Sequence, residues 1–374
     1  MRVLLTGGGT AGHINPALAI ADIIRANDPD AVIGYVGTPT GMENSLVAKE
    51  GYPMYHVDVR GFRRSLSPKN LKAAWLALVS PRAAEKIIDE FKPDFVLGTG
   101  GYVSWPVLVA AARRGVPCAV HEANAVPGVT VTRVEKYVDR VFLNYKESSQ
   151  RLKYPDKHLH VGCPLRGSFY SSAASSKSAF PEEAPDDRSA YVLCYGGSLG
   201  ADRINETLLS MLAERDTRLS RTAFCIGTGE RNYVSFKASF AELGLGGPYI
   251  EVLSYIYDMP KRMEAADIVV CRSGAITLSE LALLGKCAIL IPSPNVTNDQ
   301  QYKNAKLLAD SGAAVVIREK DLTPEKLADE IAGLSCNPER RAEMSRRIQS
   351  FAVPDSGKRI YEEMVRLVKE KKRK

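Results

Sequence analysis

The segment Val3-Leu4-Leu5-Thr6-Gly7-Gly8-Gly9-Thr10-Ala11-Gly12-His13 places a glycine-rich turn directly after a short apolar run. A continuous apolar run predicts a strand buried on both faces, and a helix-like segment follows at Pro16 to Ala26. The second half of the chain opens in the same way, with an apolar run at Tyr191 to Tyr195 before Gly196-Gly197-Ser198-Leu199-Gly200. Two such openings predict an α/β protein with two doubly wound parallel sheets.

The other apolar runs continue this alternation of strands and helices through both halves. Further strands are expected at residues 32–36, 54–59, 95–98, 118–121, 141–144, 223–226, 250–253, 268–271, 288–291 and 314–317. Residues 168–190 are rich in Ser, Ala and Pro and lack apolar periodicity, which predicts a linker or loop between the halves.

Length and composition agree with a globular protein of two domains. The chain has 374 residues, of which 45% are hydrophobic and 25% charged, and its formal net charge is +7. This balance excludes a mostly disordered chain and does not require nucleic acid, but it suits an anionic substrate or membrane surface. No apolar run approaches the roughly 20 residues that span a bilayer. The seven cysteines are scattered without zinc spacing, which is typical of reduced packing residues in a cytoplasmic protein.

The first glycine turn fits two kinds of ligand site. Gly7, Gly9 and Gly12 satisfy the G-x-G-x-x-G pattern of a dinucleotide-binding domain. The second strand, however, ends at Thr38 without the carboxylate that such a domain uses to hold a ribose, which disfavours a dinucleotide oxidoreductase. His13 stands at the mouth of the turn, where open α/β sheets bind ligands, and we interpret it as functional rather than structural.

Two turns in the second half are suited to a phosphate group. Gly196-Gly197-Ser198 and Arg272-Ser273-Gly274 each follow a strand and precede a helix, so that backbone N–H groups and a helix dipole face an anion. Neither contains the lysine of a P-loop, which argues against phosphoryl transfer. Glu280 lies farther along the second helix, where it either accepts hydrogen bonds from ribose hydroxyls or belongs to a solvated helix face.

These segments form part of a longer series of motifs. The series comprises Thr10 to His13, Gly100-Gly101-Tyr102-Val103-Ser104, His121-Glu122-Ala123-Asn124-Ala125-Val126-Pro127-Gly128, Gly162-Cys163-Pro164-Leu165-Arg166, Gly196-Gly197-Ser198, Arg272-Ser273-Gly274-Ala275-Ile276-Thr277-Leu278-Ser279-Glu280-Leu281-Ala282, Gly285-Lys286, Pro292 and Asp299-Gln300-Gln301-Tyr302-Lys303-Asn304-Ala305. With these motifs in this order, nearly the whole chain resembles the MurG family. Enzymes of that family transfer N-acetylglucosamine from UDP-GlcNAc to undecaprenyl-diphospho-muramoyl-pentapeptide (lipid I to lipid II), a step of peptidoglycan and cell wall biogenesis.

The resemblance implies a GT-B fold, in which two Rossmann-like domains face a central cleft. Residues 1–163 would bind the acceptor and the membrane, and residues 164–353 would bind UDP-GlcNAc. A helix within residues 354–374 would return to the first domain. The implied location is the cytoplasmic face of the bacterial cell membrane, with peripheral attachment to its anionic surface and no nucleic-acid partner.

The resemblance also implies roles for individual residues. The catalytic base is His13 or, as the alternative, Glu122. Donor contacts are implied for Thr10, Ala11, Gly12, Asn124, Arg166, Ser198, Ile256, Ala275, Ile276, Thr277, Leu278, Ser279, Glu280, Gln300 and Gln301. Tyr102 and Asn124 are implied on the acceptor side. No cofactor and no metal site are expected, because UDP-GlcNAc is a substrate and the sequence holds no metal-ligand cluster.

A lipid-linked acceptor requires a surface that meets the membrane. Leu71, Trp75, Leu78 and Val79 share one face of a predicted helix, and basic residues surround them in sequence. We expect either a membrane patch or the core-facing side of that helix.

The sequence departs from the family pattern at Ala11, Ala123, Val131, Cys163 and Leu199, which affects fine contacts. Two other functions remain open: an enzyme similar to UDP-GlcNAc 2-epimerase, and a non-catalytic protein that binds nucleotide sugars.

Overall fold

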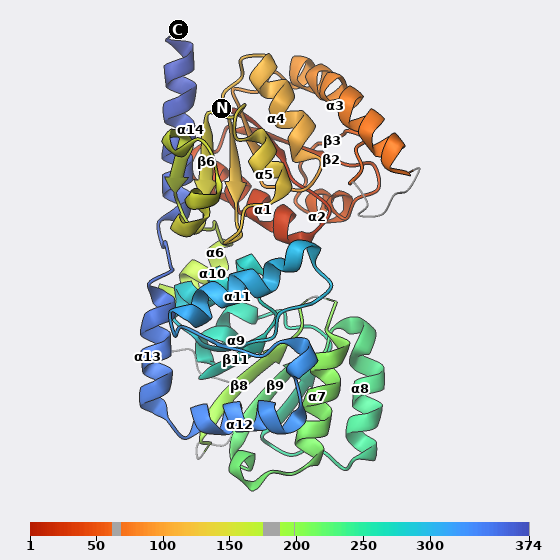
Figure 1. Cartoon of the computed structure of the whole chain (residues 1–374), viewed down its shortest axis with the longest axis vertical. Coiled ribbons are helices and arrows are strands. Elements are labelled where there is room, and N and C mark those ends of the chain that lie inside the picture. The colour runs from red at the N-terminus through yellow and green to blue at the C-terminus, as the bar shows by residue number, and fades with distance from the viewer. Residues whose placement is uncertain (62–68, 175–187, 198, 374) are drawn as a thin grey trace. The chain divides into compact units, whose positions relative to one another are not determined.

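The chain divides into two compact units in the computed structural model (Figure 1). The structure describes residues 1–61, 69–174, 188–197 and 199–373. The first unit contains residues 1–167 and 353–374, and the second contains residues 168–352. The second unit is therefore an insertion into the first along the chain.

The first unit is built on a fully parallel sheet with the strand order β3-β2-β1-β4-β5-β6-β7. Its strands are β1 (Arg2–Thr6), β2 (Val32–Gly37), β3 (Met54–His56), β4 (Phe95–Gly98), β5 (Cys118–Glu122), β6 (Arg140–Leu143) and β7 (His158–His160). The strand order reverses between β1 and β4. In open α/β sheets the carboxyl ends of the strands at such a switch point form the ligand site.

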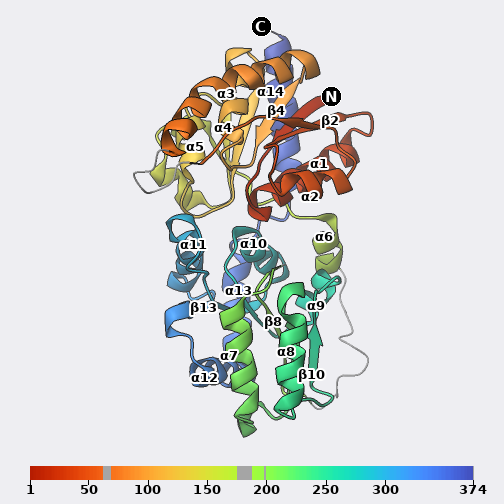
Figure 2. The ribbon, with the colours of Figure 1, turned by 90° about the vertical axis from the view of Figure 1, so that its right-hand side faces the viewer.

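Helices cover both faces of this sheet (Figure 2). The helices are α1 (Ala11–Asn27), α2 (Glu43–Lys49), α3 (Lys69–Phe91), α4 (Ser104–Arg113), α5 (Val129–Val134) and α14 (Ser356–Lys372), with short 3-10 helices at Lys146–Arg151 and Pro155–Lys157. Apolar side chains of α1, α2 and α14 pack on one face, and those of α3, α4 and α5 pack on the other.

The second unit repeats this plan with the parallel strand order β10-β9-β8-β11-β12-β13. The strands are β8 (Ala190–Tyr195), β9 (Thr222–Gly227), β10 (Ile250–Leu253), β11 (Ile268–Cys271), β12 (Cys287–Leu290) and β13 (Val315–Val316). The helices are α6 (Gly167–Ala174), α7 (Asp202–Ala213), α8 (Glu230–Glu242), α9 (Met259–Ala265), α10 (Ala275–Leu284), α11 (Gln300–Asp310), α12 (Pro324–Ser335) and α13 (Pro338–Gln349), with 3-10 helices at Thr217–Leu219, Thr297–Asp299 and Glu319–Asp321. The switch point lies between β8 and β11.

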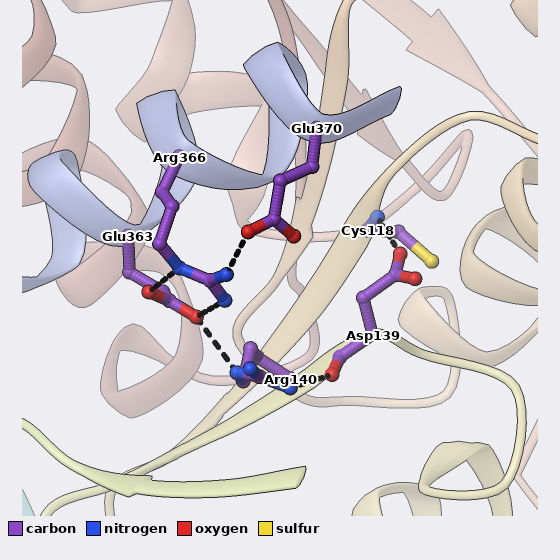
Figure 3. A network of polar contacts seen from close by, with 6 residues as sticks. All are labelled: Cys118, Asp139, Arg140, Glu363, Arg366 and Glu370. Carbon is purple, nitrogen blue, oxygen red and sulfur yellow. Dashed lines mark hydrogen bonds and ion pairs between the residues drawn. The ribbon is translucent and has the colours of Figure 1, made fainter. Parts of the chain in front are cut away.

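The last helix, α14, is fixed to the first unit by apolar and polar contacts. Ile360 and Met364 are fully buried in the same apolar cluster as residues of α1. On the polar side, Arg140 of β6 donates a 2.7 Å hydrogen bond to Glu363, and Arg366 pairs with the same carboxylate at 2.6 Å (Figure 3). The Arg140 guanidinium also donates to the carbonyl oxygen of Asp139 (Figure 3). Helix α14 therefore belongs to the first unit.

Three local expectations need correction. Residues 168–190 are not structureless throughout, because α6 continues to Ala174 and β8 begins at Ala190; residues 175–187 lie outside the described part of the chain. The third strand ends at His56 rather than at residue 59. The short edge strand β7 was not expected, because its sequence His-Leu-His is not an apolar run.

In the described ranges, no helix is both long and apolar enough to cross a membrane.

Candidate active site

The glycine turn after β1 lies at the switch point of the first sheet, beside the turn after β4. The Tyr35 hydroxyl donates a 2.8 Å hydrogen bond to the carbonyl oxygen of Gly7. Gly101 has a φ of +79°, and a Cβ atom there would lie 2.3 Å from the carbonyl oxygen of Gly8. Only glycine at position 101 permits this close approach of the two turns.

His13 lies in the first turn of α1 and projects its ring into this junction. Its Nδ1 atom is 3.0 Å from the carbonyl oxygen of Gly8 and 3.2 Å from the Thr10 hydroxyl. Because a carbonyl oxygen can only accept, the Gly8 contact requires a proton on Nδ1, which leaves the lone pair on Nε2. The ring is partly exposed, yet desolvation lowers its pKa against the opposing effect of the Gly8 hydrogen bond. His13 is therefore a neutral base near pH 7.

Glu122, the alternative base, ends β5 with its carboxylate buried in the following loop. One oxygen accepts hydrogen bonds of 2.9 Å from both the backbone and the side chain of Asn124, and the other accepts a 2.6 Å bond from the Gly128 N–H. Burial raises the pKa of Glu122 despite these bonds. Since both oxygens hold the loop, the geometry favours His13 as the base.

The remaining predicted residues of this unit lie at the same edge of the sheet. Thr10 precedes α1 and is exposed, Ala11 and Gly12 form the first turn of that helix, and Tyr102 follows β4 and is 51% exposed. These side chains are accessible to a ligand.

Arg166 lies in the first unit, not in the second domain expected for residues 164–353. Its guanidinium donates a 2.6 Å hydrogen bond to Asp22 and a second bond to Glu50. Two carboxylates thus orient this cation, and its contact with a diphosphate stays a prediction.

The sequence-based reasoning missed Glu43 at the start of α2. This carboxylate is fully buried beneath the first glycine turn and accepts hydrogen bonds from the N–H groups of Thr38 and Gly9. The available signal was an acidic residue five positions after Thr38.

In the second unit, α10 begins directly after β11 at the switch point. Gly274 precedes the helix in an extended conformation, and the fully buried Ser273 donates a 2.9 Å hydrogen bond to the carbonyl oxygen of Gln301. Arg272 donates to the carbonyl oxygen of Ile291 at 3.1 Å and pairs with Glu319. These bonds hold the turn so that the first N–H groups of α10 remain available to an anion.

The predicted donor residues of α10 have different surroundings. Ala275, Ile276 and Thr277 are partly buried in its first turn. Leu278 is a core residue, and Ser279 donates its hydroxyl proton back to the Ala275 carbonyl at 3.0 Å. The helix therefore offers its first turn rather than all six predicted positions as a ligand surface.

Glu280 is the chemically distinctive group of this helix. Burial raises the pKa of its carboxyl to about 7. No hydrogen bond or ion pair reaches this carboxyl from the part of the chain that the structure describes. A desolvated carboxylate without a partner is suited to accept hydrogen bonds from hydroxyl groups of a ligand.

Three predicted donor residues lie on neighbouring segments. Ile256 is buried with its Cδ1 atom 2.7 Å from the position of a Cβ at Gly227, the last residue of β9. Gln300 begins α11. Gln301 has a structural contact, because its Oε1 atom accepts a 2.8 Å hydrogen bond from the Ser293 N–H. Ser198 lies outside the described residues.

The predicted membrane helix is α3. Trp75 is 60% exposed and Leu78 is 77% exposed, so neither faces the core, and Val79 is partly buried. The side chain of Leu71 lies outside the described part of the structure. Leu76 and Ile88 provide the buried face of the helix instead. The core-facing interpretation is therefore wrong for Trp75 and Leu78.

Two doubly wound parallel sheets, each with glycine turns at its switch point, form the architecture of GT-B glycosyltransferases. The glycosyltransferase family 28 N-terminal domain matches residues 3–143, and the family 28 C-terminal domain matches residues 191–360. The chain is thus a glycosyltransferase of family 28 with the GT-B fold.

Its relatives identify the family more closely. A protein of Acetivibrio thermocellus named "UDP-N-acetylglucosamine--N-acetylmuramyl-(pentapeptide) pyrophosphoryl-undecaprenol N-acetylglucosamine transferase" is 41% identical and covers 99% of both chains. A protein of the same name from Lactococcus lactis is 37% identical over 96% of this chain and 98% of its own. The crystal structure of Acinetobacter baumannii MurG matches with a TM-score of 0.77 and 28% identity, over 98% of this chain and 99% of that chain. The chain belongs to the MurG family.

A structural likeness extends beyond this family. The UDP-GlcNAc 2-epimerase of Neisseria meningitidis has a TM-score of 0.68 at 15% identity, over 98% of this chain and all of that one. At this identity the likeness concerns the fold alone.

Proposed function

We propose that this protein is an inverting transferase that moves N-acetylglucosamine from UDP-GlcNAc to undecaprenyl-diphospho-muramoyl-pentapeptide, converting lipid I to lipid II in peptidoglycan biosynthesis. The observation that carries the proposal is the similarity to transferases of that name over 99% of both chains. The two switch points add the groups that the reaction needs: a base in the first unit, and an anion-binding turn with a carboxylate in the second.

The second unit is proposed to bind the donor. Ribose hydroxyls would supply the hydrogen bonds that Glu280 lacks, each worth about 1.5–3 kcal/mol for a charged acceptor. The first turn of α10 and Ser198 would bind the diphosphate through N–H groups, the helix dipole and a hydroxyl. Ile256 would offer an apolar surface to the uracil ring, and Gln300 would contact the sugar.

The first unit is proposed to bind the acceptor. Thr10, Tyr102 and Asn124 follow the carboxyl ends of β1, β4 and β5 in the same unit as His13, where they would orient the muramoyl sugar. This assignment follows from the partial exposure of these residues and from the general position of ligands in doubly wound sheets.

The reaction then needs one proton transfer and one displacement. The acceptor hydroxyl oxygen attacks the anomeric carbon of N-acetylglucosamine while His13 Nε2 takes the hydroxyl proton. The bond between the anomeric carbon and the diphosphate breaks on the opposite face, so that UDP leaves and the configuration inverts. A positioned base contributes about 10²–10⁴-fold to such a step. Hydrogen bonds from the α10 turn stabilise the charge that develops on the leaving diphosphate.

Membrane attachment is proposed through α3. Trp75 and Leu78 expose apolar surface, and Arg82 and Lys86 on the same helix are exposed cations. An apolar surface with basic neighbours binds an anionic leaflet, with each basic residue near the surface adding about 1 kcal/mol. This arrangement would hold the enzyme peripherally at the cytoplasmic face of the cell membrane, where its lipid-linked acceptor lies.

The test uses the purified chain with UDP-GlcNAc labelled in the sugar and the lipid-linked muramoyl-pentapeptide, together with a control lacking acceptor. Label that enters the lipid fraction only with acceptor supports the transferase. Acceptor-independent conversion of the sugar would point to an epimerase instead. Donor binding without turnover in either reaction would leave a nucleotide-sugar-binding protein.

A further inference from the structure

The Glu43 carboxylate lies in a close-fitting cradle of backbone. Its Oε1 atom accepts hydrogen bonds of 2.8 Å from the Thr38 N–H and 2.7 Å from the Thr38 hydroxyl, and its Oε2 atom accepts a 3.3 Å bond from the Gly9 N–H. A Cβ atom would lie within 2.8 Å of the Glu43 side chain at Gly8, within 2.6 Å at Gly37 and within 2.1 Å at Gly41. Larger residues at these positions would displace the carboxylate.

The charge on this buried group is maintained by its donors. Burial acts to raise the pKa of Glu43, but hydrogen bonds from Thr38 and Gly9 outweigh it, and the net pKa is below the usual value. A buried carboxylate is costly unless it is fully hydrogen-bonded. Its place beneath a functional turn therefore calls for an explanation beyond the packing of α2.

That explanation lies in the peptide groups on either side of Gly8. Tyr35 fixes the carbonyl oxygen of Gly7, and Glu43 fixes the N–H of Gly9. The Gly8 residue between them carries the carbonyl oxygen that contacts His13 Nδ1 at 3.0 Å. Hydrogen bonds thus fix the peptide groups on both sides of Gly8 and set the direction of its carbonyl oxygen. That direction decides which ring nitrogen of His13 carries the proton.

We propose that Glu43 is a positioning residue, which holds the Gly8–Gly9 turn so that His13 carries its proton on Nδ1 and presents a basic Nε2 atom to the acceptor. The catalytic part of this inference rests on the proposed function; the tautomer part does not. Glu43 touches no reacting atom and acts only through the backbone of the turn.

The test is the variant Glu43→Gln, which preserves the shape of the side chain. Because Thr38 directs two donors at the Oε1 position, the amide oxygen should occupy that position, and the NH₂ group then meets the Gly9 N–H, so that this hydrogen bond is lost. The ¹⁵N NMR signals of the histidine ring report the tautomer directly, and His13→Ala assigns the His13 signals. The control is Glu90→Gln, which removes an exposed acidic charge on α3 of the same unit.

In the wild type we expect His13 to show a protonated Nδ1 and an unprotonated Nε2. In Glu43→Gln we expect a mixture of tautomers, a decrease in kcat of about 10- to 100-fold and a KM for UDP-GlcNAc within about twofold. Glu90→Gln should match the wild type. Unchanged His13 signals in a folded Glu43→Gln protein would overturn the proposal, whatever happens to kcat.

A second variant covers the possibility that Glu43→Gln does not fold. Thr38→Val removes one hydroxyl donor and keeps the carboxylate, so that the same changes should occur to a smaller extent. If neither the tautomer nor kcat changes in Thr38→Val, the inference is again overturned. Should the wild type transfer no sugar, the proposed function fails, yet the NMR experiment still decides whether Glu43 sets the state of His13.

Discussion

The ring of His13 lies directly against the backbone of Gly100. A Cβ atom at residue 100 would lie 2.7 Å from His13 Cδ2 and 3.0 Å from Nε2, and Gly100 has a φ of +110°. The turn after β4 thus provides one wall for the imidazole, on the side of the nitrogen that is proposed to take the proton.

Gly100→Ala should therefore displace His13 and strain the turn. We expect kcat to fall about 100-fold, because a shift of about 1 Å in a reacting group has that effect. The melting temperature should also fall, since alanine is unfavourable at positive φ. Steady-state kinetics and thermal unfolding measure the two effects, with Gly167→Ala as the control, because a Cβ there meets no heavy atom within 4 Å. A fully active Gly100→Ala enzyme would contradict the placement of His13 at the reaction centre.

His13→Ala should lower kcat by about 10²–10⁴-fold and leave the Kd for UDP-GlcNAc nearly unchanged. The pH profile provides a second measurement. Desolvation lowers the pKa of His13 from its usual 6.5, so that the base loses activity only as the pH falls below that value. The acidic limb of the kcat profile should lie below pH 6.5 in the wild type and be absent from the residual activity of the variant. The same acidic limb in both proteins would assign it to another group.

Glu280 should release a proton when the donor binds. Because burial raises its pKa to about 7, about half of the carboxyl groups are protonated at pH 7 in the free protein. Hydrogen bonds from ribose hydroxyls favour the charged form, so that binding should release about half a proton per site. Calorimetry with UDP in buffers of different ionisation enthalpy measures this number. The Glu280→Gln variant should release fewer protons when UDP binds, and its affinity for UDP should be about 10- to 100-fold weaker. The control variant Glu242→Gln should match the wild type in both measurements.

The same group gives the unliganded protein a pH dependence of stability. The folded pKa lies above the usual 4.5, so the stabilisation from the protonated carboxyl is full below about pH 4.5 and is lost as the pH rises through about 7. The wild type should therefore lose more stability than Glu280→Gln between pH 5 and pH 8. Parallel stability curves for the two proteins would show that Glu280 is not desolvated.

Leu78→Glu should weaken binding to anionic vesicles without destabilising the fold, because Leu78 is 77% exposed. The expected decrease is about 10-fold or more, since a buried leucine contributes about 1.5–3 kcal/mol and the new charge is repelled. Val234→Glu is the matched control, because Val234 is also 77% exposed but lies on α8 of the second unit. Vesicle co-sedimentation distinguishes the two variants, and an equal loss in both would contradict a specific role for α3.

Met364→Ala should destabilise the first unit by about 2–5 kcal/mol, because the side chain is fully buried between α14 and α1. Chemical denaturation followed by tryptophan fluorescence measures this loss, since Trp75 and Trp105 are both in that unit. The control is Glu362→Ala on the same helix. Because the Glu362 side chain is exposed, this substitution should change the free energy of unfolding by less than about 0.5 kcal/mol.

The sequence was sufficient for the features that depend on hydrophobic pattern and local turn chemistry. Most of the buried strands appear as apolar runs, and the glycine turns at Gly7 and Gly274 identify both switch points. Hydrophobic pattern and turn chemistry did not predict the contacts between segments that are distant in the sequence. Glu43 lies on α2 but contacts the glycine turn after β1. Arg166 pairs with two carboxylates that are more than 100 positions earlier in the sequence, and Gln301 accepts a hydrogen bond from the backbone of Ser293. Such roles depend on side-chain direction in the folded state, which hydrophobic periodicity does not encode.

The insertion of residues 168–352 into the first unit has a consequence for synthesis on the ribosome. Although the strands of the first sheet are all synthesised by β7, the apolar surface of α1 that α14 covers has no partner until α14 emerges. At about 5–20 residues per second, translation of the inserted unit takes on the order of 10 to 40 s. During that interval the nascent first unit exposes this apolar surface of α1, and the inserted unit is the first that can fold to completion. A chaperone that binds apolar surface would have its main opportunity in this period.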